Sequence, residues 1–434
     1  MSQFIEPKNT TNSKDATISE ETNALHNEVQ QQQGGGGVSG VSVSGEGEVV
    51  VDEQLDTFTS WDSLGISTEL LRGIFSYGFE QPSPIQQKAI KPIMNGRDII
   101  AQAQSGTGKT ATFSIGALSR VNTKENCNQV LIMSPTHELT SQISGVVSAL
   151  GNLIPGLRVK TIIGGSSIDD DVEEMHKTPP HVIVGTPGRV YDMIRRRHIN
   201  AKKLKLVILD EADEMLSRGF KDQVYNIFQY LNKDVQIALF SATLPPEVLP
   251  ITDKIMRNPI RITVLAEKLT LDGIKQYYVA LDDDRQKYDT LKDLYNGITF
   301  SQCIIYCNSK ERVQDLYDAM VQDQFPVCCI HSNMDKNERS KAFAEFRSGN
   351  ARVLISSNVT ARGIDIQQVS VVVNFDIPRD KSTYIHRIGR SGRWGRKGIG
   401  INFVTRRDSM NLRAIQDYYQ CQIVELPGDL SRLH

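Results

Sequence analysis

Short apolar runs, separated by stretches long enough for a helix, recur along this chain and restrict its fold more than any other feature. In the first half they occupy residues 99–101, 130–133, 160–163, 182–184, 206–209 and 237–240. The pattern restarts with residues 274–279, 303–306, 327–330, 353–355, 371–374 and 400–404. Nearly continuous apolar runs that alternate with helices are typical of parallel strands buried on both faces. The pattern predicts two tandem α/β domains, each with a doubly wound parallel sheet and with ligands at the carboxyl ends of its strands.

The 434 residues, of which 39% are apolar, suit two hydrophobic cores better than one. We expect a disordered acidic tail at residues 1–54, because this segment is rich in polar residues and glycine and offers little apolar surface to bury. A nucleotide-binding domain is expected at residues 55–262 and a second domain at residues 272–434, with a hinge at residues 263–271 between them.

The formal net charge of −2 conceals an uneven distribution, because nine acidic residues and two lysines give the tail a charge of −7. The remainder carries +5, which is compatible with nucleic-acid binding without proving it. The six cysteines include no Cys-x-x-Cys pair, so reduced core cysteines are favoured over a metal site. No apolar run is long enough to span a membrane, and we expect an intracellular protein, cytoplasmic or nuclear.

A glycine-rich loop follows the first apolar run: residues 103–110 read Ala-Gln-Ser-Gly-Thr-Gly-Lys-Thr. A strand, such a loop and then a helix form a cradle in which backbone N–H groups face a phosphate. We expect Lys109 to face solvent and pair with the β- and γ-phosphates of a nucleotide, and Thr110 to bind Mg²⁺. The loop residues expected at the nucleotide are Ser105, Gly106, Thr107 and Gly108.

A second apolar run, residues 206–209, ends abruptly in Asp210, Glu211 and, after one alanine, Asp213. An enzyme with such a phosphate-binding loop also needs a carboxylate near its metal ion, at the end of a second strand. The two segments together predict a site that hydrolyses a nucleoside triphosphate.

The same residues resemble a known family. Asp210-Glu-Ala-Asp213, with the loop before it and Ser241-Ala-Thr243 after it, is similar to the motifs of the DEAD-box RNA helicases. The resemblance extends from about Trp61 to the C-terminus, and residues 101–114 look like the branch that contains translation initiation factor four-A and its nuclear paralogue. It implies two RecA-like domains.

The resemblance also implies an adenine site before the loop. Phe79 would stack on the base, Gln86 would hydrogen-bond to it, and Trp61 takes the place of an upstream aromatic residue. A guanine nucleotide is disfavoured, because the chain has no Asn-Lys-x-Asp sequence.

Catalytic and coupling roles follow from the same resemblance. Asp210 would hold Mg²⁺ and Glu211 would orient the attacking water, while Ser241 and Thr243 would hydrogen-bond toward Asp213. In the second half, Arg390 and Arg393 would neutralise transition-state charge. His386 would couple the domains, and Gly363 with Asp365 would lie at the ribose.

The RNA contacts implied by the family are sequence-independent and fall on backbone groups, hydroxyls and a few arginines. In the first half they are Pro135, Thr136, Gly164, Gly165, Thr186 and Arg189. In the second half they are Asn308, Arg339 and the Ser357 region.

This chain departs from the family pattern on the RNA side. His137 replaces an arginine, Lys336 replaces a glutamine, and Ser357-Asn358 replaces Thr-Asp. His331-Ser332-Asn333 likewise replaces His-Gly-Asp. We expect His137 to face an RNA phosphate with a weakened charge, which puts the strength of unwinding in doubt more than ATP hydrolysis.

The predicted function is that of an ATP-dependent RNA helicase of the initiation-factor-four-A type, which closes on ATP and single-stranded RNA and separates short duplexes. ATP and Mg²⁺ are the expected cofactors, and a monomer that binds RNA and an unidentified protein scaffold is expected. The alternative is an ATP-gated RNA clamp with weak unwinding, acting in splicing, export or ribosome biogenesis. A DNA helicase is a weaker third possibility.

Overall fold

The computed structural model describes residues 49–51, 55–103, 106–165, 167–216, 219–264, 274–298, 300–360, 369–391 and 398–430. The residues described here all belong to one unit, Gly47–His434. The expected disordered tail therefore lies outside the described residues, apart from 49–51. Among the described residues, no helix combines the length and apolar character needed to cross a membrane.

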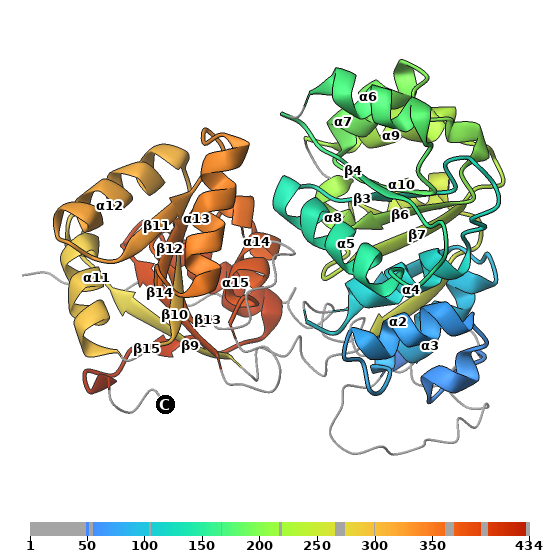
Figure 1. Cartoon of the computed structure of the whole chain (residues 1–434). Coiled ribbons are helices and arrows are strands. Elements are labelled where there is room, and N and C mark those ends of the chain that lie inside the picture. Colours follow the sequence, from blue (N-terminus) through green and yellow to red (C-terminus); the bar gives the residue numbers. More distant parts are fainter. Residues whose placement is uncertain are drawn as a thin grey trace, which may run out of the picture. The chain divides into compact units, whose positions relative to one another are not determined.

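The first half forms an eight-stranded sheet (Figure 1). Its strands, in spatial order, are β1 Val49–Val51, β8 Ile260–Val264, β2 Ile99–Gln102, β7 Gln236–Ser241, β6 Leu206–Asp210, β3 Val130–Met133, β5 Val182–Gly185 and β4 Val159–Ile162. All neighbouring pairs are parallel except β1 and β8, which are antiparallel.

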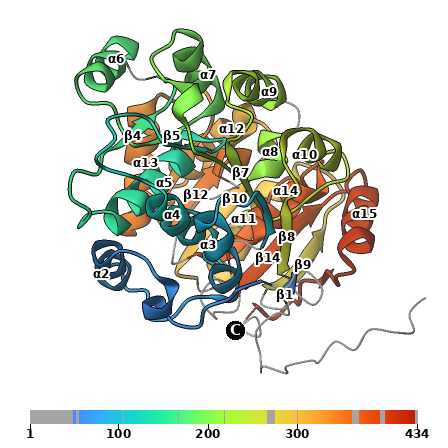
Figure 2. The same cartoon turned by 90° about the vertical axis from the view of Figure 1, so that its right-hand side faces the viewer.

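Helices cover both faces of this sheet. They are α2 Thr68–Ser76, α3 Pro84–Met94, α4 Lys109–Ser119, α5 His137–Leu150, α6 Ile168–Lys177, α7 Pro187–Arg195, α8 Ala212–Met215, α9 Lys221–Tyr230 and α10 Leu249–Ile255, with short 3-10 helices η1 Trp61–Leu64 and η2 Ala201–Lys203. Helices α3, α4 and α5 lie side by side (Figures 1 and 2).

Strand β3 shows why the sheet needs helices on both faces. Val130 and Ile132 belong to one apolar core. Leu131 and Met133 point the other way and belong to a second core. Because side chains alternate along a strand, a strand that is apolar at every position must be covered twice.

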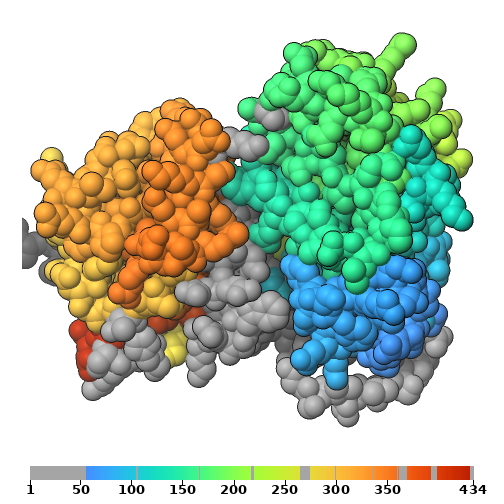
Figure 3. Space-filling model, viewed as in Figure 1, coloured from blue at the N-terminus to red at the C-terminus, as the bar shows by residue number. Residues whose placement is uncertain are grey.

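The second half repeats this architecture with seven strands, all paired in parallel. In spatial order they are β11 Val327–Ile330, β12 Val353–Ser356, β10 Gln302–Tyr306, β13 Val369–Asn374, β14 Gly398–Val404, β9 Ile274–Ala280 and β15 Val424–Glu425. The helices are α11 Gln286–Gly297, α12 Lys310–Gln322, α13 Lys336–Ser348, α14 Lys381–Ile388 and α15 Ser409–Tyr419, with the 3-10 helix η4 Asn358–Thr360. In the space-filling view, the orange segment that contains α12 and α13 forms much of the visible surface of the second half (Figure 3).

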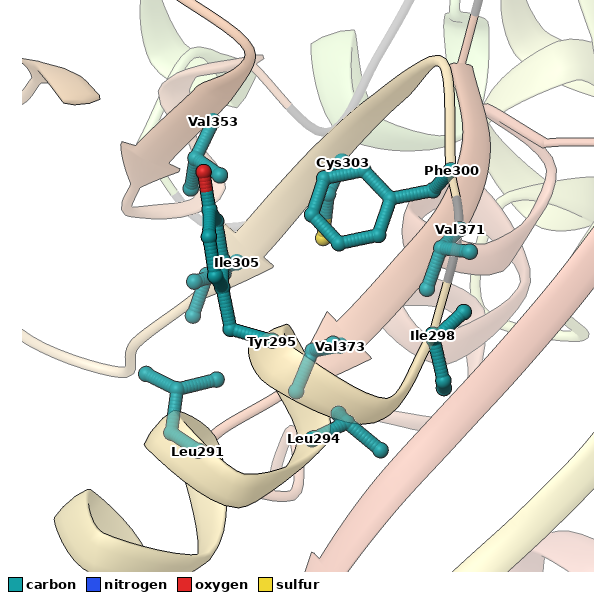
Figure 4. A pocket seen from close by; sticks show the side chains of 10 residues that line it. All are labelled: Leu291, Leu294, Tyr295, Ile298, Phe300, Cys303, Ile305, Val353, Val371 and Val373. Atoms are coloured by element: carbon teal, nitrogen blue, oxygen red, sulfur yellow. The ribbon is translucent and has the colours of Figure 1, made fainter. Parts of the chain in front are cut away.

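A small apolar cavity of about 10 Å³ lies between α11 and the second sheet. Its lining comprises Leu291, Leu294, Tyr295, Ile298, Phe300, Cys303, Ile305, Val353, Val371 and Val373 (Figure 4). Because a single water needs about that much space and several polar partners, the cavity is a packing gap in the core and has no room for a ligand.

The structure confirms the two doubly wound sheets and corrects several boundaries. Val49–Val51 was expected in the disordered tail but forms β1, which pairs with β8. The hinge was expected to begin at residue 263, yet β8 continues to Val264. Strands β8 and β15 were not predicted. The remaining hinge residues, 265–271, lie outside the described residues.

Candidate functional site

Three neighbouring strands of the first sheet end at the candidate nucleotide site. Gln102 at the end of β2 pairs with Ser241 at the end of β7. Asp210 at the end of β6 pairs with Phe240 of β7. Because these strands are parallel, the phosphate loop, the Ser-Ala-Thr segment and the acidic segment all leave the sheet at one edge.

The phosphate loop turns into α4 through two glycines with positive φ, Gly106 at 86° and Gly108 at 95°. A Cβ on Gly108 would lie 2.7 Å from Nε2 of Gln86, so no larger residue fits there. Ser83, which the sequence analysis did not single out, donates from Oγ to the carbonyl oxygen of Thr107 over 2.8 Å. The helix that carries Gln86 is thereby joined directly to the loop.

Gln86 itself is 3% exposed, and its Oε1 accepts a hydrogen bond of 2.7 Å from the Ser83 amide. The pattern Ser83-x-x-Gln86 is that of a helix-capping pair and was a signal in the sequence for this contact. The amide that was expected to contact adenine therefore also holds the start of α3.

Lys109 was expected to face solvent, and this is wrong. Its side chain is buried, with Nζ donating to the carbonyl oxygen of Ala103 over 2.5 Å. Thr110 follows it in the first turn of α4.

The aromatic residues of the expected adenine site pack together. Trp61 is 1% exposed, and its ring centroid lies 6.5 Å from that of Phe79 and 5.8 Å from that of Phe58. Phe79 is only partly buried and lies 4.9 Å from Tyr77. Trp61 thus supports Phe79 and presents almost no surface of its own to a base.

Three acidic residues are buried where β6 meets α8. Asp210, Glu211 and Asp213 are 3%, 2% and 4% exposed. Glu211 has a left-handed backbone, with φ at 53°, a strained conformation for a residue other than glycine. Burial and the neighbouring Glu211 charge raise the pKa of Asp210 to about 7, while Lys109 opposes the shift.

Asp213 makes hydrogen bonds with three residues, donating to one of them and accepting from two. Its backbone amide donates to Oγ of Ser241 over 3.4 Å. Oγ1 of Thr243 donates to its Oδ2 over 2.6 Å. Nε2 of His386 lies 3.0 Å from the same carboxylate oxygen and must be the donor to it. The hydrogen bond from His386 thus connects α14 to the acidic segment, although the two residues lie 173 positions apart in the sequence.

Glu211, Asp213 and His386 form a buried group whose ligand atoms lie within 4.8 Å of one another. Oε2 of Glu211 and Nδ1 of His386 lie 3.8 Å apart, too far for a hydrogen bond, and neither has a partner among the described residues. Oε2 of Glu211 is therefore buried and not committed to a hydrogen bond within the part of the chain that the structure describes.

Arg390 lies one turn after His386 and donates from Nε to the His386 carbonyl oxygen over 3.1 Å. It is 2% exposed. Four other predicted site residues lie outside the described residues: Ser105, Gly363, Asp365 and Arg393.

The predicted RNA residues of the first half lie at the same edge of the sheet. Pro135 precedes α5, which Thr136 caps by accepting from the Leu139 amide over 3.3 Å. Gly164 and Gly165 follow β4, and Thr186 precedes α7.

Arg189, the only arginine predicted for RNA in this half, forms an ion pair of 3.2 Å with Asp171. Lys160 lies 3.1 Å from the same aspartate. With a side chain only 9% exposed, Arg189 offers little surface to a phosphate.

The expectation that His137 faces an RNA phosphate is not supported. Nη2 of Arg339 lies 3.3 Å from Nδ1 of His137, which must accept because a guanidinium only donates. Nη1 of Arg339 forms an ion pair of 2.9 Å with Glu138. His137 thus belongs to a contact with the second half of the chain, with Arg339 as the cation.

The chain was compared with known proteins. Residues 83–251 match the model of the DEAD/DEAH box helicases, and residues 286–395 match that of the helicase conserved C-terminal domain. A protein named ATP-dependent RNA helicase eIF4A, from Aspergillus niger, is 50% identical over 389 residues, which cover 90% of this chain and 96% of that protein.

Two solved structures are similar over most of the chain. Dbp5 from S. cerevisiae bound to RNA and ADP BeF3 has a TM-score of 0.81 at 38% identity, with 86% of this chain and 97% of that chain covered. A Dbp5 variant bound to a Gle1 variant and IP6 has a TM-score of 0.69 at 38% identity, with 86% and 96% covered.

Proposed function

Because the chain belongs to the DEAD-box helicase family, we propose that the edge of its first sheet hydrolyses ATP to drive RNA unwinding through the residues described above. The chain is an ATP-dependent RNA helicase similar to eIF4A. The alternative of an RNA clamp gains no support from these relatives.

The nucleotide would bind with its phosphates on the loop, at residues 103–110, and its base near Phe79 and Gln86. Lys109 would exchange the Ala103 carbonyl for the β- and γ-phosphates, which offer it charged acceptors. Trp61 would act by holding Phe79 in place. Oε1 of Gln86 already accepts from Ser83, so its Nε2 would be the group that reads the base.

The acidic segment fits a divalent cation. Three buried carboxylates lie together, and burial with the neighbouring Glu211 charge raises the pKa of Asp210. Asp210 and Thr110 would hold Mg²⁺, which prefers one or two carboxylates and keeps several waters. The ion would neutralise phosphate charge. Glu211 would orient the attacking water, because its Oε2 is not committed to a protein donor.

The main observation behind the proposal is that residues from both halves of the chain hydrogen-bond to the Asp213 carboxylate. Thr243 holds this carboxylate from the first half and His386 holds it from the second. Loss of the γ-phosphate would shift the loop and acidic segment, and the shift would reach α14 through His386. Arg390 and Arg393 follow His386 and would approach the phosphates only while this contact is made.

RNA would be held at the carboxyl ends of the strands in both halves by backbone and hydroxyl groups. The similar Dbp5 structure contains bound RNA, which supports RNA as the ligand of this chain. The Dbp5 complex with Gle1 makes a protein partner plausible for this chain as well. We propose an intracellular location, in the cytoplasm or the nucleus, because the reaction needs ATP and RNA.

RNA-stimulated ATPase activity and unwinding of a short RNA duplex would test the function. His386→Ala should keep its affinity for a fluorescent ATP analogue and lose at least tenfold of the RNA-stimulated rate, since an arginine placed by this contact is worth ~10³–10⁵ in rate. His176→Ala, an exposed histidine on α6, is the matched control and should behave as wild type. Absence of RNA stimulation in the wild type would overturn the function. A wild-type rate in His386→Ala would overturn only the coupling.

A further inference from the structure

Two histidine rings contact each other on the surface of the first half of the chain. Nε2 of His176, in the last turn of α6, lies 3.2 Å from Nδ1 of His198, which follows α7. The ring planes are nearly perpendicular, at 87°, and the ring centroids lie 5.4 Å apart. Because α6 and α7 connect parallel strands, both helices end at the edge of the sheet opposite to the nucleotide site.

The backbone at His198 is fixed by the motif that ends α7. The His198 amide donates to the Met193 carbonyl oxygen over 2.9 Å, and the Arg197 amide donates to the Ile194 carbonyl oxygen over 2.9 Å. Arg197 has the left-handed backbone that this motif requires, with φ at 65°. The position of His198 relative to α7 is therefore set by backbone hydrogen bonds.

The residue next to each histidine is buried in one apolar core. Met175 precedes His176 and is 4% exposed, and Ile199 follows His198 and is 2% exposed. Both belong to the same cluster of core residues. The backbones of the two histidines are thus fixed relative to each other, so a common ligand would require only small rotations of the rings.

The distance between the two nitrogens suits a tetrahedral metal ion. Bonds of about 2.0–2.1 Å at the tetrahedral angle place two imidazole nitrogens about 3.3–3.4 Å apart. Adjacent ligands of a square-planar ion would lie closer together, at about 2.8–3.0 Å. The observed 3.2 Å is nearer to the tetrahedral value. Zn²⁺ is the ion that imidazoles typically bind with this geometry.

The charged side chains nearby in the sequence are mainly basic. They are Lys177, Arg195, Arg196 and Arg197, with Glu173 and Asp192 as the acids that pair with the first three. A net charge of +2 opposes an ion such as Mg²⁺, which binds to oxygen ligands. Zn²⁺ bonds to neutral nitrogens, and the C-terminal ends of two helices add partial negative charge. The surroundings therefore select against Mg²⁺ more than against Zn²⁺.

We propose that His176 and His198 bind one Zn²⁺ ion, whose remaining positions are open to water or to an anionic ligand. The ion takes the place of the proton between the two nitrogens, and the ring that donated this proton carries it on its other nitrogen instead. The ion would join α6 to α7. This site lies outside the ATP and RNA machinery, so the inference goes beyond the proposed function.

Equilibrium dialysis of the full chain against ZnCl2, with MgCl2 in excess and without nucleotide, tests the site. The wild type should bind one more Zn²⁺ than the double variant His176→Ala/His198→Ala, because the cysteines and the buried acidic group are unchanged. Each single variant should bind that ion at least roughly tenfold more weakly, since even residues that only support a metal ligand are worth this much.

Lys177→Ala is the matched control, because it changes the exposed residue next to His176 without removing a ligand. It also removes one nearby cation, so it should bind Zn²⁺ at least as tightly as the wild type. Thermal unfolding in EDTA verifies that each variant folds. His176 is exposed, so its substitution tests the site even if His198→Ala is destabilised.

Equal binding of Zn²⁺ by the wild type and the double variant would overturn the proposal. A difference that appears only when MgCl2 is left out would overturn it as well, because the ion would then be held by carboxylates. The RNA-stimulated ATPase rate of the wild type has no part in either outcome, so this test and that of the proposed function fail separately.

Discussion

The buried Asp210 carboxylate of the nucleotide site lowers the free energy of unfolding at neutral pH. Burial and the Glu211 charge raise the pKa of Asp210 to about 7 from an ordinary value of 3.8. Between these two values the folded chain holds a proton that the unfolded chain has released. The free energy of unfolding therefore falls as the pH rises from about 4 to about 7.

Asp210→Asn should accordingly stabilise the protein in the absence of nucleotide. We expect a melting temperature several degrees higher at pH 7.5, with a gain that shrinks as the pH is lowered toward 5. Circular dichroism melts across this range would measure it. Asp293→Asn, exposed on α11, is the control and should leave the pH profile as it is. A gain that does not change with pH would show that the buried charge is not its cause.

His137 was predicted to face an RNA phosphate, but in the structure it contacts Arg339. An arginine at this position would place a second guanidinium beside Arg339, whose Nη2 lies 3.3 Å from the histidine ring. His137→Arg should lower the RNA-stimulated ATPase rate severalfold because like charges repel. His137→Gln, which can still accept from Arg339, should stay near wild type. Tighter RNA binding by the arginine variant would restore the view that this position faces a phosphate.

At the scale of elements, the packing of α2 against α5 depends on a glycine. A Cβ on Gly73 of α2 would lie 2.0 Å from the carbonyl oxygen of Leu150, at the end of α5. The two helices therefore approach more closely than any other residue would allow. The clash would be with a backbone atom of Leu150, which cannot move aside as the end of a flexible side chain can.

Gly73→Ala should thus destabilise the chain by at least 1–3 kcal/mol, roughly the range for overpacking. Gly145→Ala on α5 is the matched control, since nothing lies within 4 Å of its Cβ. It should stabilise the chain by about 0.5–1 kcal/mol, because alanine loses less backbone entropy in a helix. Urea unfolding curves of both variants would measure this, and equal effects would contradict the packing argument.

At the scale of the whole molecule, a few side-chain contacts join the first half of the chain to the second. His386 reaches Asp213, and Arg339 reaches Glu138. The second pair is well shielded, with side chains 14% and 12% exposed. Ion pairs of this kind are coupled strongly when solvent is largely excluded.

A double-mutant cycle would measure that coupling. Glu138→Gln and Arg339→Gln should each lower the RNA-stimulated ATPase rate severalfold, and the double variant should be little worse than either alone. Arg347→Gln, an exposed arginine on α13, should have no such effect. Effects that multiply in the double variant would mean that the two residues act separately.

The sequence by itself determined the elements and the order of the motifs. Unbroken apolar runs predicted the buried strands. Glycines and paired acidic residues predicted the turns that follow them, because both signals are local in the sequence. The short strands β1 and β15 escaped prediction, since only pairing with β8 and β9 makes strands of them. Ser241 and Thr243 are hydrogen-bonded with Asp213, as the resemblance implied, whereas the coupling roles of these residues and of His386 stay predictions.

Only the tertiary structure decided which charged groups are committed to one another. Lys109 folds onto a carbonyl, Arg189 pairs with Asp171, and Arg339 pairs with a residue 201 positions earlier. Arg387 was not singled out in the sequence, yet three asparagines from separate segments surround it. A sequence pattern shows that a side chain is charged. Whether that charge is neutralised depends on distances across the fold, because Coulombic and hydrogen-bond energies act through space and not along the chain.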